Sequence, residues 1–451
     1  MKEKKVAFVS LGCDKNLVDS EKMLELLNEA NFMIVSDESA ADVIVVNTCC
    51  FIKDALEESI ETILEMAQYK EGGSCKGIVV AGCLGQRYEK EVFEQMPEVD
   101  AVVGTSAIEE IVKAVTEVLE GKKHVLYMES IDKPEKEQTK RILSTAGYFA
   151  YLKIAEGCDC HCTYCVIPKI RGKYRSRHME SLVEEAKNLA EQGVKELLLV
   201  AQDTALYGKD LYGESKLAEL LEALCKVEGL EWIRLLYCYP EHITQKTIEV
   251  MSKEPKICHY IDMPLQHTDD TILKKMGRRS NQALIREKIE YMRKLMPDIA
   301  VRTTFITGFP QETEQEFENL LAFVKEIQFD RLGVFTYSQE ENTPAAQMEG
   351  QIAEEIKEER KEKLMEMQKF ISAQKCESFV GKTIKVLIEG RLPEENVYCA
   401  RSYRDAPDID GLVFVSSKEE LISGDFVDVL ITQASDYDLI GEVIYGDESG
   451  K

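Results

Sequence analysis

Hydrophobic and polar residues alternate along the first 120 residues in a pattern typical of a layered α/β domain. Three short β-branched runs are apolar on both faces, as buried parallel strands are: Val6–Ser10, Val43–Val46 and Gly77–Val80. Stretches with helical spacing of apolar residues follow at about 18–30, 52–69, 86–96 and 107–120. Residues 3–120 are therefore predicted to form a doubly wound α/β domain.

A second set of strands and helices follows a charged, aperiodic stretch at residues 121–143, which we interpret as a linker. Amphipathic helical patterns separate six strand patterns, at Tyr148–Ile154, Glu196–Ala201, Trp232–Tyr237, Tyr260–Pro264, Val301–Thr307 and Arg331–Tyr337. A closed barrel of this kind has eight units. Six units over residues 144–376 therefore predict an open, partial (β/α)6 barrel.

The last part of the chain changes from helix to strand. A long charged helical pattern at residues 353–378 precedes four strand patterns, at Thr383–Glu389, Leu412–Val415, Phe426–Thr432 and Leu439–Ile444. Short, regularly spaced strands predict a small, OB-like antiparallel β-barrel at residues 377–447.

The 451-residue chain is strongly acidic, with 56 Lys and Arg against 82 Asp and Glu. Because Lys and Arg neutralise phosphates, the net charge of −26 disfavours free nucleic acid as a partner and favours a basic one. Seven basic and fifteen acidic residues fall within 380–451, and we expect Asp405, Asp408 and Asp410 to form an acidic docking segment there. The alternative is that these aspartates only keep the barrel soluble.

No segment approaches the ~18 apolar residues of a membrane span, and the first residues lead directly into a strand pattern. Fourteen cysteines without a signal peptide indicate reduced thiols that bind metal instead of forming disulfides. We therefore expect a cytoplasmic protein with no membrane partner.

Three of the cysteines follow the first strand of the predicted barrel with the spacing C-x3-C-x2-C: Cys158, Cys162 and Cys165. Three thiolates can hold a four-iron cluster and leave one iron open to another ligand. A zinc knuckle is the alternative, but no histidine pair or second C-x2-C completes four ligands. The position after a strand predicts a cluster at the mouth of the barrel, where barrel chemistry resides.

Three further cysteines each stand just beyond a strand of the N-terminal domain: Cys13, Cys49 and Cys83. Ligands bind at this edge of open α/β sheets, so the three thiols are predicted to converge on a second metal site. Chance core cysteines would more often lie within the strands. Cys50 and Cys75 lack this placement and are not expected to be ligands.

A basic run, Lys169–Arg177, stands out in so acidic a chain. It could contact a cofactor carboxylate, an acidic substrate side chain or a phosphate, or it could be a solvated loop. Gln202 and Gln266 follow the second and fourth strands of the barrel and could hold a polar cofactor at its mouth.

Together these patterns resemble the methylthiotransferases, a family of radical S-adenosylmethionine (SAM) enzymes. The resemblance covers essentially the whole chain, as an N-terminal methylthiotransferase domain, a radical SAM core and a terminal TRAM domain. The motifs that carry it include Ser10-Leu-Gly-Cys-Asp-Lys-Asn-Leu-Val-Asp-Ser-Glu21, Val46-Asn-Thr-Cys49, Gly82-Cys-Leu-Gly-Gln-Arg87 and Arg401-Ser-Tyr-Arg-Asp-Ala-Pro-Asp-Ile-Asp-Gly411. The first and the last favour the branch of the family that modifies a ribosomal protein.

The resemblance implies two [4Fe–4S] clusters and SAM as cofactors. Cys158, Cys162 and Cys165 would hold the cluster that chelates and cleaves SAM, while Cys13, Cys49 and Cys83 would hold the cluster that carries the transferred sulfur. The implied product is a methylthio group on the β-carbon of an aspartate in the twelfth small-subunit ribosomal protein, with a reducing electron donor as a further partner. Tyr164, Gln202 and Gln266 are the residues expected in the SAM shell.

Two other functions stay open at this point. One is a tRNA adenosine methylthiotransferase with the same clusters, and the other is a non-catalytic Fe–S electron carrier or scaffold. A carrier would saturate its irons with four cysteines, which two sites of three cysteines argue against. Cys160 lies inside the C-x3-C-x2-C motif and is a conceivable competing ligand, but only Cys158 gives the x3 spacing to Cys162.

Overall fold

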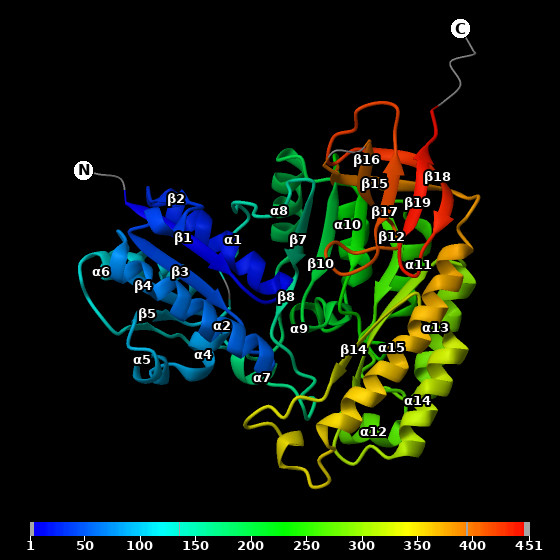
Figure 1. The fold of residues 1–451 in the computed structure, drawn as a ribbon, viewed down its shortest axis with the longest axis horizontal. Coiled ribbons are helices and arrows are strands. Elements are labelled where there is room, and N and C mark those ends of the chain that lie inside the picture. The colour runs from blue at the N-terminus through cyan, green and yellow to red at the C-terminus, as the bar shows by residue number, and fades with distance from the viewer. Residues whose placement is uncertain (1–3, 135, 394–395, 446–451) are drawn as a thin grey trace.

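The computed structural model describes residues 4–134, 136–393 and 396–445, which form two six-stranded sheets, a closed barrel and a small two-stranded sheet of β8 (Ala155–Glu156) and β9 (Arg175–Ser176) (Figure 1). Residue 3 and residues 446–447, expected at the ends of the first and last domains, lie outside the described residues.

The N-terminal sheet is parallel, with six strands in the order β2-β1-β3-β4-β5-β6. Two separate hydrophobic cores pack on its two faces, which confirms the doubly wound fold. β5 is a strand that the sequence patterns missed, and β6 lies within the stretch interpreted as a linker. The strands are β1 (Lys5–Ser10), β2 (Met33–Val35), β3 (Val43–Thr48), β4 (Gly77–Gly82), β5 (Val99–Val103) and β6 (Val125–Tyr127), and the helices are α1 (Asp14–Glu29), α2 (Lys53–Ala67), α3 (Tyr69–Gly72), α4 (Cys83–Tyr88), α5 (Glu91–Gln95) and α6 (Ile111–Leu119).

The central sheet is also parallel, with the order β14-β13-β12-β11-β10-β7, and its two edge strands do not pair with each other. This confirms the open partial barrel. Its strands are β7 (Phe149–Lys153), β10 (Glu196–Val200), β11 (Trp232–Leu235), β12 (Ile257–Asp262), β13 (Ala300–Thr307) and β14 (Arg331–Thr336). Its longer helices are α8 (Met179–Glu191), α10 (Leu217–Cys225), α11 (Gln245–Lys253), α13 (Gln282–Leu295), α14 (Glu314–Ile327) and α15 (Glu354–Glu377), and its short elements are β8 (Ala155–Glu156), α7 (Ile167–Ile170), β9 (Arg175–Ser176), α9 (Lys209–Tyr212) and α12 (Asp270–Lys275).

The C-terminal sheet is a closed barrel in the order β15-β16-β17-β19-β18, as expected for a small OB-like domain. Four of its ladders are antiparallel, and the fifth, between β17 and β19, is parallel. The strands are β15 (Thr383–Arg391), β16 (Val397–Ser402), β17 (Val413–Ser416), β18 (Phe426–Ala434) and β19 (Leu439–Val443).

The concave face of the open barrel is covered by both neighbouring domains. Val18 of α1 and Ala406 of the small barrel belong to the same hydrophobic core as Leu198 and Tyr260 of the central strands. Figure 1 shows the N-terminal domain against one flank of the central sheet and the small barrel beside the strands. The three domains are thus packed together through one shared core.

The expectation of an acidic docking segment at Asp405, Asp408 and Asp410 is wrong for two of the three residues. Asp405 is 1% exposed and pairs with Arg331 of β14. The side chain of Asp410 is 3% exposed, accepts a hydrogen bond from Tyr260 at 2.7 Å and lies 3.4 Å from Arg302. These aspartates face the central sheet because arginines at its inner face require buried anionic partners, and of the three only Asp408 is exposed.

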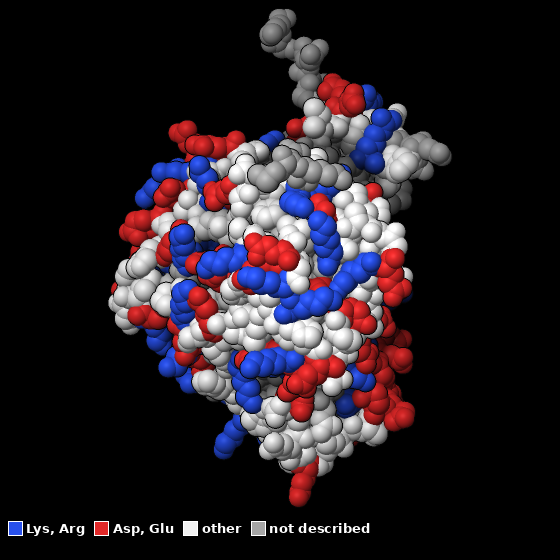
Figure 2. All heavy atoms as spheres, turned by 90° about the vertical axis from the view of Figure 1, so that its left-hand side faces the viewer, with Lys and Arg blue, Asp and Glu red and all other residues white. Residues whose placement is uncertain are grey.

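Figure 2 shows the face formed by the N-terminal domain, on which basic and acidic side chains lie side by side. No helix among the described residues is long and apolar enough to cross a bilayer.

Candidate metal centres

The three N-terminal cysteines occupy equivalent places at the carboxyl edge of their sheet. Cys13 caps the start of α1 after β1, Cys49 follows β3, and Cys83 is the first residue of α4 after β4. Cys13 is exposed, whereas Cys49 and Cys83 are buried. Each thiol of Cys49 and Cys83 is an electrostatic neighbour of Cys13, so the structure brings the three together.

Two glycines allow the close approach of these segments. Gly12 has a φ of 88°, and a Cβ there would lie 3.0 Å from Cys49 Sγ. Gly82 has a φ of 89°, and a Cβ there would lie 2.3 Å from Asn47 Oδ1. Both positions lie in the left-handed region that favours glycine, so the residues before Cys13 and Cys83 cannot readily carry a side chain.

The second trio lies in the loop between β8 and α7, beyond the first strand of the barrel. Cys158 and Cys162 are buried and Cys165 is partly buried. The backbone amides hold the loop, since Cys165 N donates to Cys162 O at 3.0 Å and Cys158 N donates to Gly172 O at 3.0 Å. Burial raises the pKa of Cys162, which also has Cys158 and Arg278 as charged neighbours.

Cys158 and Cys160 differ in the direction of their pKa shifts. A side-chain hydrogen bond from Cys160 lowers the pKa of Cys158, and the same bond raises the pKa of Cys160. The backbone amide of Cys160 also donates to Cys158 Sγ at 3.4 Å. This amide donor stabilises a thiolate on Cys158, and the thiolate is the form that binds metal.

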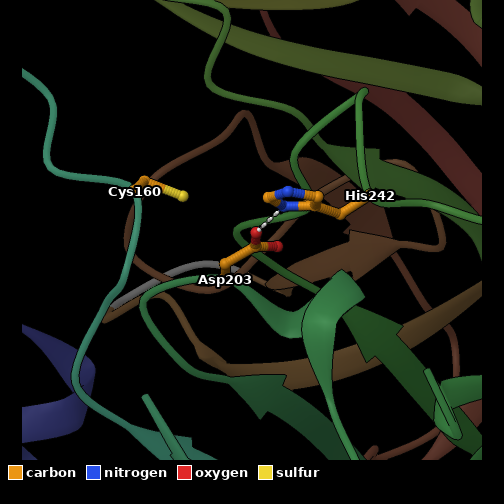
Figure 3. A group of neighbouring side chains, drawn as sticks. All are labelled: Cys160, Asp203 and His242. Atoms are coloured by element: carbon orange, nitrogen blue, oxygen red, sulfur yellow. Dashed lines mark hydrogen bonds and ion pairs between the residues drawn. The ribbon is translucent and has the colours of Figure 1, made fainter. Parts of the chain in front are cut away.

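Cys160 instead points toward Asp203 and His242, as Figure 3 shows. Its sulfur and the ligand atoms of these two residues all lie within 4.8 Å of one another. His242 Nδ1 is 2.5 Å from Asp203 Oδ2, so these two groups already satisfy each other. The sequence patterns missed His242, which comes from the loop between β11 and α11 and has no motif around it.

Arg278 is a second residue that sequence reasoning missed. It is 6% exposed, its guanidinium lies 3.9 Å from the centre of the Tyr239 ring, and its Nη2 donates to Pro264 O at 3.2 Å. Its Nε and Nη1 have no hydrogen-bond partner among the described residues. Glu241 Oε2 lies 3.8 Å from its Nη2. The donors of this buried cation that make no hydrogen bond can still bind the carboxylate of a small ligand.

The three residues expected around SAM have different surroundings. Tyr164 interacts electrostatically with Cys162, Cys165 and Arg278, and burial raises the pKa of its hydroxyl. Gln202 Nε2 donates to Glu156 Oε1 at 2.7 Å, while its Oε1 is buried without a partner among the described residues. Gln266 has a φ of 70°, and its backbone bridges to Phe305 of β13.

The basic run Lys169–Arg177 contributes to the contact between the first two domains. Arg171 is 3% exposed and contacts Asp19 and Asn16 of α1 at 2.6 and 3.1 Å. Arg177 Nη1 lies 2.6 Å from Glu185 Oε2 of α8. Arg171 and Arg177 are therefore buried in ion pairs, and the alternative of a solvated loop does not hold for them.

Two further contacts join the edges of the sheets around the cysteines. The Lys15 ammonium lies 3.4 Å from the centre of the Tyr237 ring, which joins the first turn of α1 to the end of β11. Arg87 Nη1 donates to Cys50 O at 3.0 Å and to Glu340 Oε2 at 3.2 Å. The two cysteine sites thus belong to sheet edges that face each other across the domain contact.

The donor set fits iron–sulfur clusters. One site offers three thiols that follow three parallel strands, and the other offers three thiols in one loop after the first barrel strand. A three-thiolate site leaves one iron of a four-iron cluster open. Burial raises the pKa of Cys83 to about 12, despite the nearby Arg171. Such a thiol stays protonated until a metal displaces its proton.

Three family models match successive parts of the chain. Residues 5–104 match the uncharacterized protein family UPF0004, residues 152–324 match the radical SAM superfamily, and residues 380–444 match the TRAM domain.

Curated relatives match over nearly the whole length. The ribosomal protein uS12 methylthiotransferase RimO of Lachnoclostridium phytofermentans is 55% identical, with 97% of this chain and 99% of that protein covered. The proteins of the same name from Desulforamulus reducens and Acetivibrio thermocellus are each 50% identical, over 97% and 100% of this chain and 99% and 100% of their own lengths.

Solved structures share the fold at low sequence identity. The radical SAM methyltransferase TsrM from Kitasatospora setae superposes with a TM-score of 0.56 at 13% identity, covering 76% of this chain and 77% of its own. The cobalamin-dependent SAM radical enzyme OxsB gives a TM-score of 0.53 at 15% identity, covering 82% of this chain and 56% of its own.

Proposed function

Since this chain belongs to the RimO family of ribosomal protein uS12 methylthiotransferases, we propose that its two cysteine trios hold the two [4Fe–4S] clusters of that reaction. The chain is a radical SAM enzyme that transfers a methylthio group to an aspartate of uS12. When bound, one cluster supplies the electron that cleaves SAM and the other carries the sulfur to be transferred. These cofactors supply the electron and the sulfur, so the role of the protein is to bind, orient and shield them.

Cys158, Cys162 and Cys165 are the proposed ligands of the cluster that chelates SAM. Their loop follows the first barrel strand, at the end of the barrel where ligands bind. The hydrogen bond from Cys160 that lowers the pKa of Cys158 supports Cys158 as the first ligand.

Cys13, Cys49 and Cys83 are the proposed ligands of the second cluster. The observation that carries the proposal is the convergence of these strand-end thiols at a sheet edge that contacts the barrel loop. Arg171, thirteen residues after Cys158, lies 3.3 Å from Cys83 Sγ. Two cofactors that act on one substrate carbon require this kind of proximity.

Tyr164, Gln202 and Gln266 remain the proposed SAM shell, and Arg278 joins them as the cation for the SAM carboxylate. Tyr164 and Arg278 flank Cys162, so both lie where a cofactor chelated at that cluster would sit. The contact of α1 with Tyr237 and that of Arg87 with Glu340 close the domain contact on two sides. Closure limits the access of water to the reacting groups.

Three finer points belong to the same proposal. We place the domain boundaries at residues 120, 143 and 376. We also propose that the partner protein binds near the two sheet edges that carry the cysteine sites. The reaction takes place in the cytoplasm and requires a reducing electron donor. Free nucleic acid is not the substrate, because the chain carries a net charge of −26.

The test is a pair of triple variants. Cys158→Ala with Cys162→Ala and Cys165→Ala should leave about half the iron and sulfide of the parent and abolish SAM cleavage. Cys13→Ala with Cys49→Ala and Cys83→Ala should also leave about half the iron, keep deoxyadenosine formation and lose methylthio transfer. Full iron content in either variant would contradict the two-site assignment.

The same preparations distinguish the two methylthiotransferase substrates. Reconstituted parent enzyme is assayed with SAM and reductant against purified uS12 and against tRNA. Product on uS12 alone is the expected result, and product on tRNA would overturn the proposed substrate.

A further inference from the structure

One two-residue segment of the barrel contacts a proposed ligand from each cysteine trio. The Gly172 carbonyl accepts a hydrogen bond from the backbone N–H of Cys158 at 3.0 Å. The side chain of the preceding residue, Arg171, donates from Nη2 to Cys83 Sγ at 3.3 Å. Cys158 and Cys83 belong to different domains, so this segment is a direct physical link between the two sites.

Arg171 is held in place by contacts on both sides of the domain boundary. Nη1 donates to Asp19 Oδ2 at 2.6 Å and to Glu156 Oε2 at 3.0 Å, and Nη2 donates to Asn16 Oδ1 at 3.1 Å. Asp19 and Asn16 are on α1, whereas Glu156 ends β8. A planar guanidinium can satisfy all of these acceptors and the sulfur at once, which an ammonium cannot do.

The network around Arg171 is buried and balanced in charge. Lys153 Nζ lies 2.5 Å from Asp19 Oδ1 and 2.7 Å from Glu156 Oε2, and its side chain is 0% exposed. Two cations therefore face two carboxylates away from water. Asp19 and Glu156 hold both cations in place, so the contact of Arg171 with Cys83 depends on the geometry of the domain contact.

We propose that Arg171 is a positioning residue that couples the two sites: it fixes the N-terminal cysteine site against the barrel and raises the reduction potential of the cluster held there. The inference rests on the proposed function, in that Cys83 must ligate a cluster. Reduction adds negative charge to the cluster, and a cationic donor on a ligand sulfur stabilises that charge. Burial strengthens the effect because screening by water is weak there.

The matched control is Arg141, which bridges the same two domains without contacting a cysteine. It is 4% exposed, and its guanidinium lies 3.3 Å from Glu21 of α1 and 3.3 Å from Glu185 of α8. Arg141→Gln therefore disturbs a buried ion pair across the domain contact while leaving the surroundings of Cys83 intact.

The experiment measures the midpoint potential of the N-terminal cluster alone. The full chain with Cys158→Ala, Cys162→Ala and Cys165→Ala is reconstituted with iron and sulfide and titrated electrochemically, with the reduced cluster followed by electron paramagnetic resonance. Arg171→Gln, Arg171→Lys and Arg141→Gln are added singly to this background. Iron content is determined for each, so that potentials are compared only between equally loaded proteins.

Arg171→Gln should shift the midpoint to a more negative value, Arg171→Lys should shift it less, and Arg141→Gln should leave it at the parent value. An unchanged midpoint potential in Arg171→Gln overturns the inference. An equal shift of the potential in Arg141→Gln also overturns it, because the shift would then come from a weakened contact between the domains. A background protein that binds no cluster refutes the proposed function instead. If Arg171→Gln is the only variant that fails to bind a cluster, the inference is tested by comparing the midpoint potentials of Arg171→Lys and Arg141→Gln. Only the potential of Arg171→Lys is expected to shift.

Discussion

At the scale of single residues, the local environment distinguishes cysteines that suit metal binding from neighbouring cysteines in the sequence that do not. Cys158 and Cys160 are two positions apart, yet the hydrogen bond between them favours the thiolate at Cys158 and the thiol at Cys160. Cys50 is 0% exposed within the N-terminal core, and Cys75 Sγ donates to Gly77 O at 3.4 Å. These surroundings suit packed or hydrogen-bonded thiols.

Cys160→Ala should therefore keep both clusters. The expected iron content and the visible absorbance of the reconstituted variant equal those of the parent, because Cys158, Cys162 and Cys165 remain. Cys158→Ala is the matched comparison and should lose one cluster. Loss of iron in Cys160→Ala instead would mean that the ligand set includes Cys160.

His267 links protonation to stability in the barrel. It is 0% exposed, its Nδ1 accepts from Asp269 N at 3.0 Å, and burial lowers its pKa to about 3. The unfolded chain binds a proton at this residue below about pH 6.5 while the folded chain does not, so stability falls as the pH falls through this window. Between pH 7.5 and 5.5 the share of the loss that is due to His267 is expected to be roughly 1 kcal/mol.

His267→Asn should remove this part of the pH dependence. The free energy of unfolding is measured in urea at both pH values, with the fluorescence of Trp232, the one tryptophan of the chain, as the probe of the barrel. His178→Asn, at an exposed position before α8, should keep the slope of the parent. Equal slopes in parent and His267→Asn would show that His267 does not titrate on unfolding.

At the scale of elements, the end of β16 and the loop between β16 and β17 join the small barrel to the central sheet. Arg401 Nη2 lies 2.7 Å from Glu196 Oε2 at the start of β10. Arg234 of β11 also binds Glu196, at 2.8 Å, and donates to the carbonyl of Tyr403 at 2.6 Å. Although burial alone would raise the pKa of Asp405, Arg331 and Arg404 hold it below its ordinary value. The loop is an anchor made of buried ion pairs.

Asp405→Asn should destabilise the protein by about 3–5 kcal/mol at pH 7, because Arg331 would lose its buried anionic partner. The change is measured as the urea midpoint or as the temperature of unfolding. Asp408→Asn is the control: this exposed residue has a φ of 62°, a conformation that asparagine tolerates, and the expected change is within about 0.5 kcal/mol. Similar effects of the two substitutions would argue against the anchor.

At the scale of the whole molecule, charge decides which partners approach it. The net charge of −26 favours the approach of a basic protein over that of a polyanion, and the face drawn in Figure 2 carries side chains of both signs. With Asp405 and Asp410 buried, this attraction arises from the field of the whole chain and not from one acidic segment.

Binding of purified uS12 should consequently weaken as salt is raised. We expect the association rate to fall by about tenfold or more between 50 and 300 mM NaCl, since the Debye length shortens and electrostatic steering is screened. Stopped-flow fluorescence with labelled uS12 measures this rate, and unmodified tRNA is the comparison. A salt-independent rate, or tighter binding of tRNA than of uS12, would contradict this picture.

The sequence by itself determined most of the strands and helices, and it predicted the two groups of three cysteines as metal sites. Strand patterns such as Val43–Val46 and Glu196–Ala201 are local, because a strand buried on both faces needs a continuous apolar run. The parallel order of strands and helices then places the residues after each strand at one sheet edge. Cys13, Cys49 and Cys83 could therefore be assigned to a common edge before their contacts were known.

Only the tertiary structure decided what the charged residues do. Asp19 and Arg171 are 152 positions apart, and Arg331 and Asp405 are 74 apart, so no local pattern signals these pairs. A count of acidic residues also cannot tell a buried aspartate from an exposed one, which is why the docking segment was predicted wrongly. Burial depends on which domains pack together, and that packing is set by shape and by distant partners.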